Sequence, residues 1–153
     1  MVTATTPVAG GPYSTSCSGA VDSNYTIIYV NGVLTLNAAP LTITASPTST
    51  TYGTAPAVTA SYSGFVNTDS SSNLTTQPTC VSTVLATSPV SGSPYTGANT
   101  CSGAVDSNYT ISYVAGTATV GKAALTITAS SAPMTYGGTV PTITPSYAGF
   151  VNN

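Results

Sequence analysis

Apolar and hydroxylated residues alternate along several short stretches of this chain. Leu41, Ile43 and Ala45 are separated by threonines, and the same period of two recurs across residues 58–62 and 109–113. A period of two predicts strands that bury one face and leave the other to solvent. The buried positions expected from this pattern are the aliphatic and tyrosine side chains, and the hydroxylated positions are expected to face water.

No stretch has a convincing helical period, and a single capped turn within residues 68–73 is the most helix that the sequence predicts. Ala115-Gly116 predicts a turn before a short strand that holds Ala118 and Val120, and Asn31-Gly32, a strong hairpin signal, predicts the same before Leu34 and Leu36. The expected fold is all-β, with about six or seven short strands per domain. The absence of a helix favours an immunoglobulin-like sandwich, and a β-grasp arrangement is the alternative.

The chain matches itself at a fixed spacing. "CSGAVDSNYTI" occurs at 17–27 and 101–111, and "LTITAS" at 41–46 and 125–130, in both cases 84 positions apart. "YSGFVN" at 62–67 returns as "YAGFVN" at 147–152, one residue out of phase after a small insertion. A spacing of this size predicts a repeat architecture. We name three predicted repeats. Repeat A, at 1–40, is the C-terminal half of a repeat, and repeat B, at 41–124, is a complete repeat. Repeat C, at 125–153, is the N-terminal half of a further repeat.

Short joins between these repeats, Asn37–Pro40 and Gly121–Ala124, predict a semi-rigid, extended array with neighbouring repeats as partners. The halves A and C are complementary, so two chains are also expected to be able to associate head to tail.

Charged residues are almost absent. The chain holds Asp22, Asp69, Asp106 and Lys122, with no Arg, Glu or His. Acid–base catalysis needs a group that titrates near neutral pH, and nucleic-acid binding needs several cations, so the sequence predicts no enzyme, cofactor or nucleic-acid partner. The hydrophobic content of 41% predicts a folded chain rather than a disordered one. No apolar run reaches the length of a membrane span, and any export signal is expected upstream of this segment.

Two of the three cysteines, Cys80 and Cys101, fall in repeat B, where no His and no CxxC motif accompanies them as metal ligands. We therefore expect no metal site and a structural disulfide, with two buried thiols as the alternative; the disulfide would stabilise the fold by about 3 kcal/mol. Cys17 is the counterpart of Cys101, and the counterpart of Cys80 would precede Met1. Cys17 is therefore expected to be unpaired because repeat A is truncated. A disulfide predicts an oxidising, extracellular location.

The sequence contains three further candidate sites. Asp69 with Asn67 and Asn73 offers oxygen ligands for Ca²⁺, but one carboxylate favours an ordinary Asx turn. Lys122 invites an isopeptide crosslink, which the lack of Glu disfavours. The tyrosines could stack against glycans, although their fixed places in each repeat favour core packing. The tyrosines concerned are Tyr13, Tyr52, Tyr62, Tyr95, Tyr109 and Tyr113.

The landmarks Tyr52-Gly53, "GFVN" at 64–67 and "NYTI" at 108–111 resemble those of the MBG repeat, which has a Tyr-Gly signature. Such repeats occur in tandem in very large bacterial surface and secreted adhesin-like proteins. The resemblance implies a stalk module at the bacterial cell surface, with no catalytic residues. The alternative function is a binding module that recognises glycans or cell-surface proteins.

Overall fold

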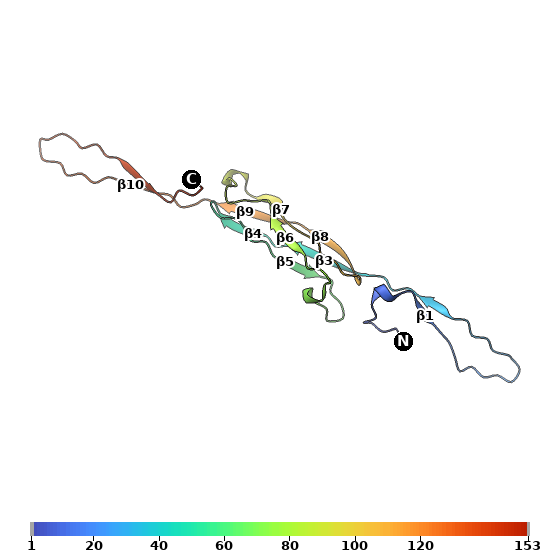
Figure 1. Ribbon diagram of the computed structural model, residues 1–153. Helices are drawn as coiled ribbons and strands as arrows, with labels where there is room; N and C mark the ends of the chain where they lie inside the picture. Colours follow the sequence, from blue (N-terminus) through green and yellow to red (C-terminus); the bar gives the residue numbers. More distant parts are fainter. Residues whose placement is uncertain (1, 153) are drawn as a thin grey trace. The chain divides into compact units, whose positions relative to one another are not determined.

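A computed structural model describes residues 2–152, and the elements in them are β-strands and three short 3₁₀ turns (Figure 1). This confirms the all-β prediction. The chain divides into two compact units, and each unit is made of three separate segments of the sequence. Unit 1 holds the residues up to Thr44, Ala60–Thr79 and Cys101–Val114, and unit 2 holds the remaining described residues.

Unit 1 is organised around β3 (Ala39–Ala45), the middle strand of a sheet with the order β5-β3-β8. β5 spans Ala60–Ser63, and β8 spans Tyr109–Val114 and runs parallel to β3. Leu41 and Ile43 have no exposed surface, whereas the threonines between them are half-buried. The period of two therefore identified the buried face of this strand correctly.

Unit 1 also holds an antiparallel pair, β1 (Tyr13–Thr15) with β2 (Gly32–Leu34), and the 3₁₀ turns η1 (Val8–Gly10) and η2 (Ser71–Asn73). The side chains of Ser70 and Asn73 cap η2 in a reciprocal capping box. The predicted turn at 68–73 is thus present in a shorter form.

Unit 2 is built on a sheet with the order β4-β9-β7-β6. These strands span Thr48–Thr51, Gly116–Gly121, Tyr95–Ser102 and Thr79–Ser82 respectively. A core of Val84, Ala98, Ala118 and Val120 packs beside it, next to the 3₁₀ turn η3 (Val90–Gly92). A separate antiparallel pair joins β10 (Thr126–Ala129) to β11 (Pro145–Ala148).

The predicted disulfide is present between Cys80 of β6 and Cys101 of β7. Cys17 carries no disulfide and is exposed. Its explanation by truncation of repeat A stays a prediction.

The hairpin predicted at Asn31-Gly32 is wrong, whereas the short strand predicted after Ala115-Gly116 is present as β9. β8 and β9, on either side of Ala115, belong to different sheets, and β2 pairs with β1 rather than with the segment just before Gly32. β8 instead runs parallel to β3, and β9 runs parallel to β4. Such pairs join strands far apart in sequence, which a local turn signal cannot reveal. The immunoglobulin-like sandwich, with the β-grasp as alternative, stays a prediction.

The match of "CSGAVDSNYTI" at 17–27 with 101–111 also predicts that Tyr25 and Ile27 begin a strand in the predicted repeat A, and this prediction too is wrong. Residues 24–31 form no strand, and Tyr25 is 75% exposed, whereas its counterpart Tyr109 is 6% exposed. In repeat B, β3 lies beside this stretch. No strand among residues 2–152 takes that place in repeat A, so its apolar side chains stay in solvent.

Local hydrogen bonds recur at corresponding positions of the predicted repeats. The amide of Ala20 donates to the Tyr29 hydroxyl at 2.6 Å, and that of Ala104 donates to Tyr113 at 2.8 Å. The Ser61 hydroxyl likewise donates to the Thr44 carbonyl and that of Ser146 to the Thr128 carbonyl, at 3.3 and 3.2 Å. At these positions, matching sequences therefore form matching hydrogen bonds.

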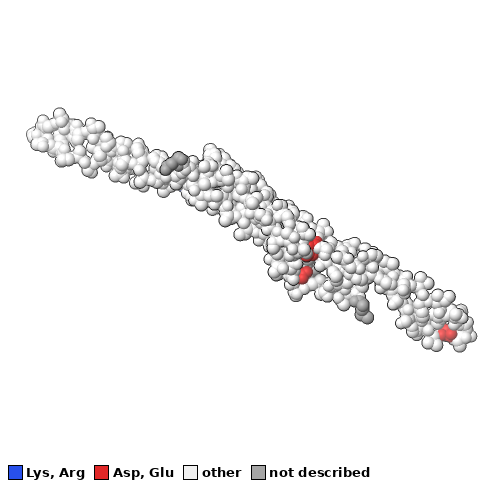
Figure 2. Space-filling view, in the orientation of Figure 1, with Lys and Arg blue, Asp and Glu red and all other residues white. Residues whose placement is uncertain are grey.

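Charged groups are sparse on the surface. Figure 2 shows the acidic atoms of one face as isolated red spots on a surface otherwise without charge. The described residues contain no helix that is both long and apolar enough to cross a membrane.

Candidate functional site

The Gly-Phe-Val-Asn loop of unit 1, residues 64–67, packs on the sheet through its aromatic ring. The Phe65 ring lies 5.6 Å from that of Tyr62 and 5.4 Å from that of Tyr109, which it meets edge to face at 85°. Gly64 has a φ of 114°, and a Cβ there would collide with the carbonyl oxygen of Pro40. Only glycine lets the loop approach β3 so closely.

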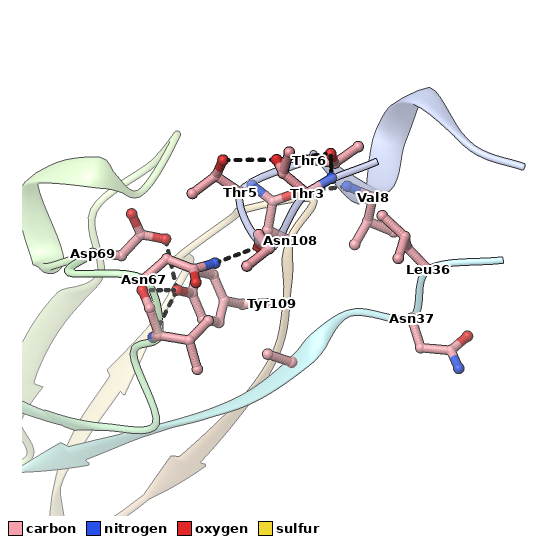
Figure 3. Close-up of a pocket in the computed structure, with 13 residues that line it drawn as sticks. Thr3, Thr5, Thr6, Val8, Leu36, Asn37, Asn67, Asp69, Asn108 and Tyr109 are labelled. Carbon is pink, nitrogen blue, oxygen red and sulfur yellow. Dashed lines mark hydrogen bonds between the residues drawn. The ribbon is translucent and has the colours of Figure 1, made fainter. Parts of the chain in front are cut away.

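The hydroxyl of Tyr109 ties this loop to β8 (Figure 3). It accepts a hydrogen bond from the Val66 amide at 3.1 Å and donates one to Asp69 Oδ2 at 2.7 Å. Burial raises the pKa of Tyr109 above its usual value of 10.0 and is the largest effect; the hydrogen bond from the Val66 amide lowers the pKa, and the hydrogen bond to the Asp69 carboxylate raises it. Tyr109 is therefore a buried, neutral anchor at neutral pH, in agreement with its predicted core role.

The residues considered for Ca²⁺ do not act together. Asp69 binds Tyr109, Asn67 donates to a backbone carbonyl, and Asn73 caps η2. No group of three or more His, Cys, Asp or Glu side chains converges within residues 2–152. Lys122 lines an apolar pocket together with Leu125 and Phe150, and no carboxyl group lines that pocket.

Asn67, in the predicted repeat B, contacts the predicted repeat A. Its side-chain amide donates to the carbonyl oxygen of Ala4 at 2.7 Å, and Asn108 Oδ1 accepts the amide of Val8 at 2.9 Å (Figure 3). Beside these bonds lies a polar pocket of about 290 Å³. Its lining includes the hydroxyl and amide side chains of Thr3, Thr5, Thr6, Asn37, Asn67 and Asn108. We call this region joint 1.

The same contact recurs in unit 2 between the predicted repeats B and C. The side-chain amide of Asn152 donates to the carbonyl oxygen of Ala86 at 2.8 Å. Asn152 and Asn67 are counterparts in "GFVN", and both have a left-handed backbone, with φ of 57° and 55°. Asparagine tolerates this conformation better than most residues. We call this region joint 2.

The Tyr-Gly signature forms the other side of joint 2. The Gly53 amide donates to the Ala86 carbonyl at 2.9 Å, so Gly53 and Asn152 share one acceptor. A Cβ on Gly53 would lie 2.9 Å from the Cβ of Val151, and Gly53 also has a φ of 100°. Glycine is needed here for both reasons, and the signature therefore receives the "GFVN" loop of the next predicted repeat.

A family model for the MBG domain of the YGX type matches residues 41–119, more than half of the chain. The chain belongs to the MBG domain family. The match lies within the predicted repeat B and includes Tyr52-Gly53, Gly64–Asn67 and both disulfide-bonded cysteines. No curated protein and no solved structure shows a significant match. Membership of the MBG family and the disulfide are consistent with a module of a bacterial surface protein.

Sequence reasoning identified the landmark motifs but missed their contact with each other. Tyr-Gly and "GFVN" each occur twice in the sequence, which shows that both recur, yet Gly53 and Val151 are almost a hundred positions apart. A glycine at a fixed place in each repeat was the available signal, because it marks a position that needs a positive φ or a close approach.

Proposed function

We propose that this MBG chain is a spacer segment of an extracellular bacterial surface protein, in which tandem repeats hold a functional domain away from the cell. The observation that carries the proposal is the contact made twice by "GFVN" asparagines, Asn67 to Ala4 and Asn152 to Ala86. A contact that recurs between successive predicted repeats is what a tandem array requires, since each repeat touches only its neighbours.

Further support comes from the covalent and electrostatic features of the chain. The disulfide between Cys80 and Cys101 suits an oxidising compartment. The surface has few charges to attract a charged partner, with Asp69 engaged by Tyr109. The buried tyrosine hydroxyl in this contact serves packing rather than chemistry.

Localisation of the chain tests the proposal. An antibody against the purified chain is expected to label intact, non-permeabilised cells of the source bacterium, and protease added to those cells should remove the label. A cytoplasmic protein of the same cells, detected with its own antibody, is the control and should be labelled only after permeabilisation. Labelling of the chain only after permeabilisation would reject a surface role.

A second candidate, recognition of glycans or cell-surface proteins, has the polar pocket of joint 1 as its site. Thr5 contributes a hydroxyl to that pocket, 3.1 Å from the hydroxyl of Thr3. Reproducible binding on a glycan array that is lost in Thr5→Val, and kept in a variant of the remote Thr139, would favour this role over a spacer alone.

A further inference from the structure

Unit 2 contains an apolar pocket at the position that corresponds, by the sequence match, to the position of Tyr109 in unit 1. This pocket, of about 300 Å³, is lined by Ala123, Leu125, Phe150 and Val151 among others. By the sequence match these four are the counterparts of Ala39, Leu41, Phe65 and Val66. In unit 1 those positions adjoin Tyr109, through the strand register, the Phe65 ring contact and the Val66 amide.

The strand beside the pocket has the same unfilled edge. β10 pairs only with β11 among the described strands, and Leu125 and Ile127 are 44% and 61% exposed. Their counterparts Leu41 and Ile43 are fully buried where β8 lies beside β3. The missing group is therefore a parallel strand that begins with a tyrosine.

The chain itself carries that strand in repeat A. "NYTIIYV" at 24–30 differs from "NYTISYV" at 108–114 at one position, Ile28 in place of Ser112. It forms no strand in the structure, and Tyr25 and Ile28 are 75% and 81% exposed. An exposed apolar strand sequence and an exposed apolar strand edge are complementary surfaces for strand addition.

We infer that residues 24–30 of a second copy of this chain add to the free edge of β10 and insert Tyr25 into the pocket at Phe150. The register follows from that of β3 with β8, in which Leu41 faces Ile111 and Thr42 faces Ser112. Leu125 then faces Ile27, and Thr126 faces Ile28. The Asn24 side chain takes the place of Asn108, whose Oδ1 accepts the Val8 amide, and so accepts the amide of Val90, which lines the pocket.

This docking rests on the proposed array, because it uses between two molecules the surfaces by which successive repeats would be completed. It leads to open head-to-tail chains rather than closed dimers, since each molecule offers one strand and one edge. The mass of the complexes therefore rises with concentration.

Light scattering and analytical ultracentrifugation of the whole chain test the docking. Cys17→Ser serves as the background, so that the exposed thiol cannot join molecules by a disulfide. The average mass is expected to grow with concentration. Tyr25→Ala or Phe150→Ala is expected to raise the dissociation constant at least about 30-fold, as for a buried aromatic anchor. Tyr136→Ala, which removes a fully exposed tyrosine, should leave it unchanged.

Crosslinking tests the register. On mixing Ile28→Cys and Thr126→Cys chains under mild oxidation, a heterodimer disulfide is expected in high yield, and Ile28→Cys with Thr128→Cys, two positions out of register, should give little. A chain that stays monomeric at every concentration, equal yields in both mixtures, or an intramolecular disulfide in the Ile28→Cys/Thr126→Cys double variant would each overturn the docking. A monomeric chain that keeps the Asn67–Ala4 and Asn152–Ala86 contacts rejects only the docking. A chain that lacks these contacts rejects the proposed array.

Discussion

Asn152 donates its side-chain amide to the carbonyl oxygen of Ala86 at 2.8 Å, and Asn67 does the same to Ala4 at 2.7 Å. Both asparagines end a "GFVN" loop, and both contacts link one predicted repeat to the one before it. A pair of identical contacts within one chain makes the joint testable, because each can be removed separately.

Two substitutions of Asn67 separate the contribution of its hydrogen bond to stability from that of its left-handed backbone. Asn67→Gly keeps the left-handed φ easily but removes the amide, and should lower the free energy of unfolding by about 1 kcal/mol, the net value of one hydrogen bond. Asn67→Ala should cost about 1 kcal/mol more, since alanine is strained at positive φ. Urea denaturation measures both. Equal stability of Asn67→Gly and wild type would show that the bond to Ala4 contributes nothing.

Gly53→Ala should disturb joint 2 beyond the strain of its backbone. Both Gly53 and Gly103 have positive φ, but a Cβ on Gly103 meets nothing within 4 Å, whereas one on Gly53 meets Val151 at 2.9 Å. Gly103→Ala is therefore the matched control and should cost about 1 kcal/mol. Gly53→Ala should cost more in the same denaturation assay and shift the NMR signals of the Val151 methyl groups. Similar costs without that shift would contradict the role assigned to the signature.

Tyr109→Phe should destabilise the fold by about 1–3 kcal/mol, because the Val66 amide and the Asp69 carboxylate lose their buried partner. Thermal unfolding followed by circular dichroism measures this loss. Tyr136→Phe, at a fully exposed tyrosine, should have no effect.

The raised pKa of Tyr109 also predicts a pH dependence. The folded state holds this proton more tightly than the unfolded chain, so the associated stability is intact below the unfolded pKa of about 10 and is lost as the pH rises through the higher folded value. Tyr109→Phe should flatten the decline in stability above pH 10. An unchanged alkaline slope in that variant would contradict the assignment of the slope to Tyr109.

The disulfide should contribute about 3 kcal/mol, so the double variant Cys80→Ser/Cys101→Ser should unfold at a much lower urea concentration. Cys17→Ser changes an exposed thiol and should leave the midpoint where it is. A double variant as stable as wild type would show that the sheet alone determines the stability.

Local sequence pattern predicted much of the fold and less of the site. The alternation of Leu41 and Ile43 with threonine identified a buried strand face because burial on one face needs only a period of two. The parallel pairing of β3 with β8 could not be predicted, because strand partners are chosen by tertiary packing over about seventy positions. For the same reason residues 24–30, which differ from the strand sequence 108–114 only at Ile28, form no strand in the absence of a neighbour.

The contacts of joint 2 could not be predicted from the sequence for a different reason. The repeat spacing showed that Gly53 and Asn152 each recur, but their shared acceptor, the Ala86 carbonyl, has no side-chain signature. A backbone acceptor can be recognised only once the loops are placed in space.

Residual dipolar couplings test most directly the central claim, that the "GFVN" asparagines join successive predicted repeats into a fixed array. In a weakly aligned sample of the whole chain, one alignment tensor is expected to fit the couplings of residues 2–15 and of residues 60–79, and Asn67→Gly should make the two fitted tensors diverge. Two tensors of different magnitude in the unaltered chain would show that the repeats move independently, and would contradict the account.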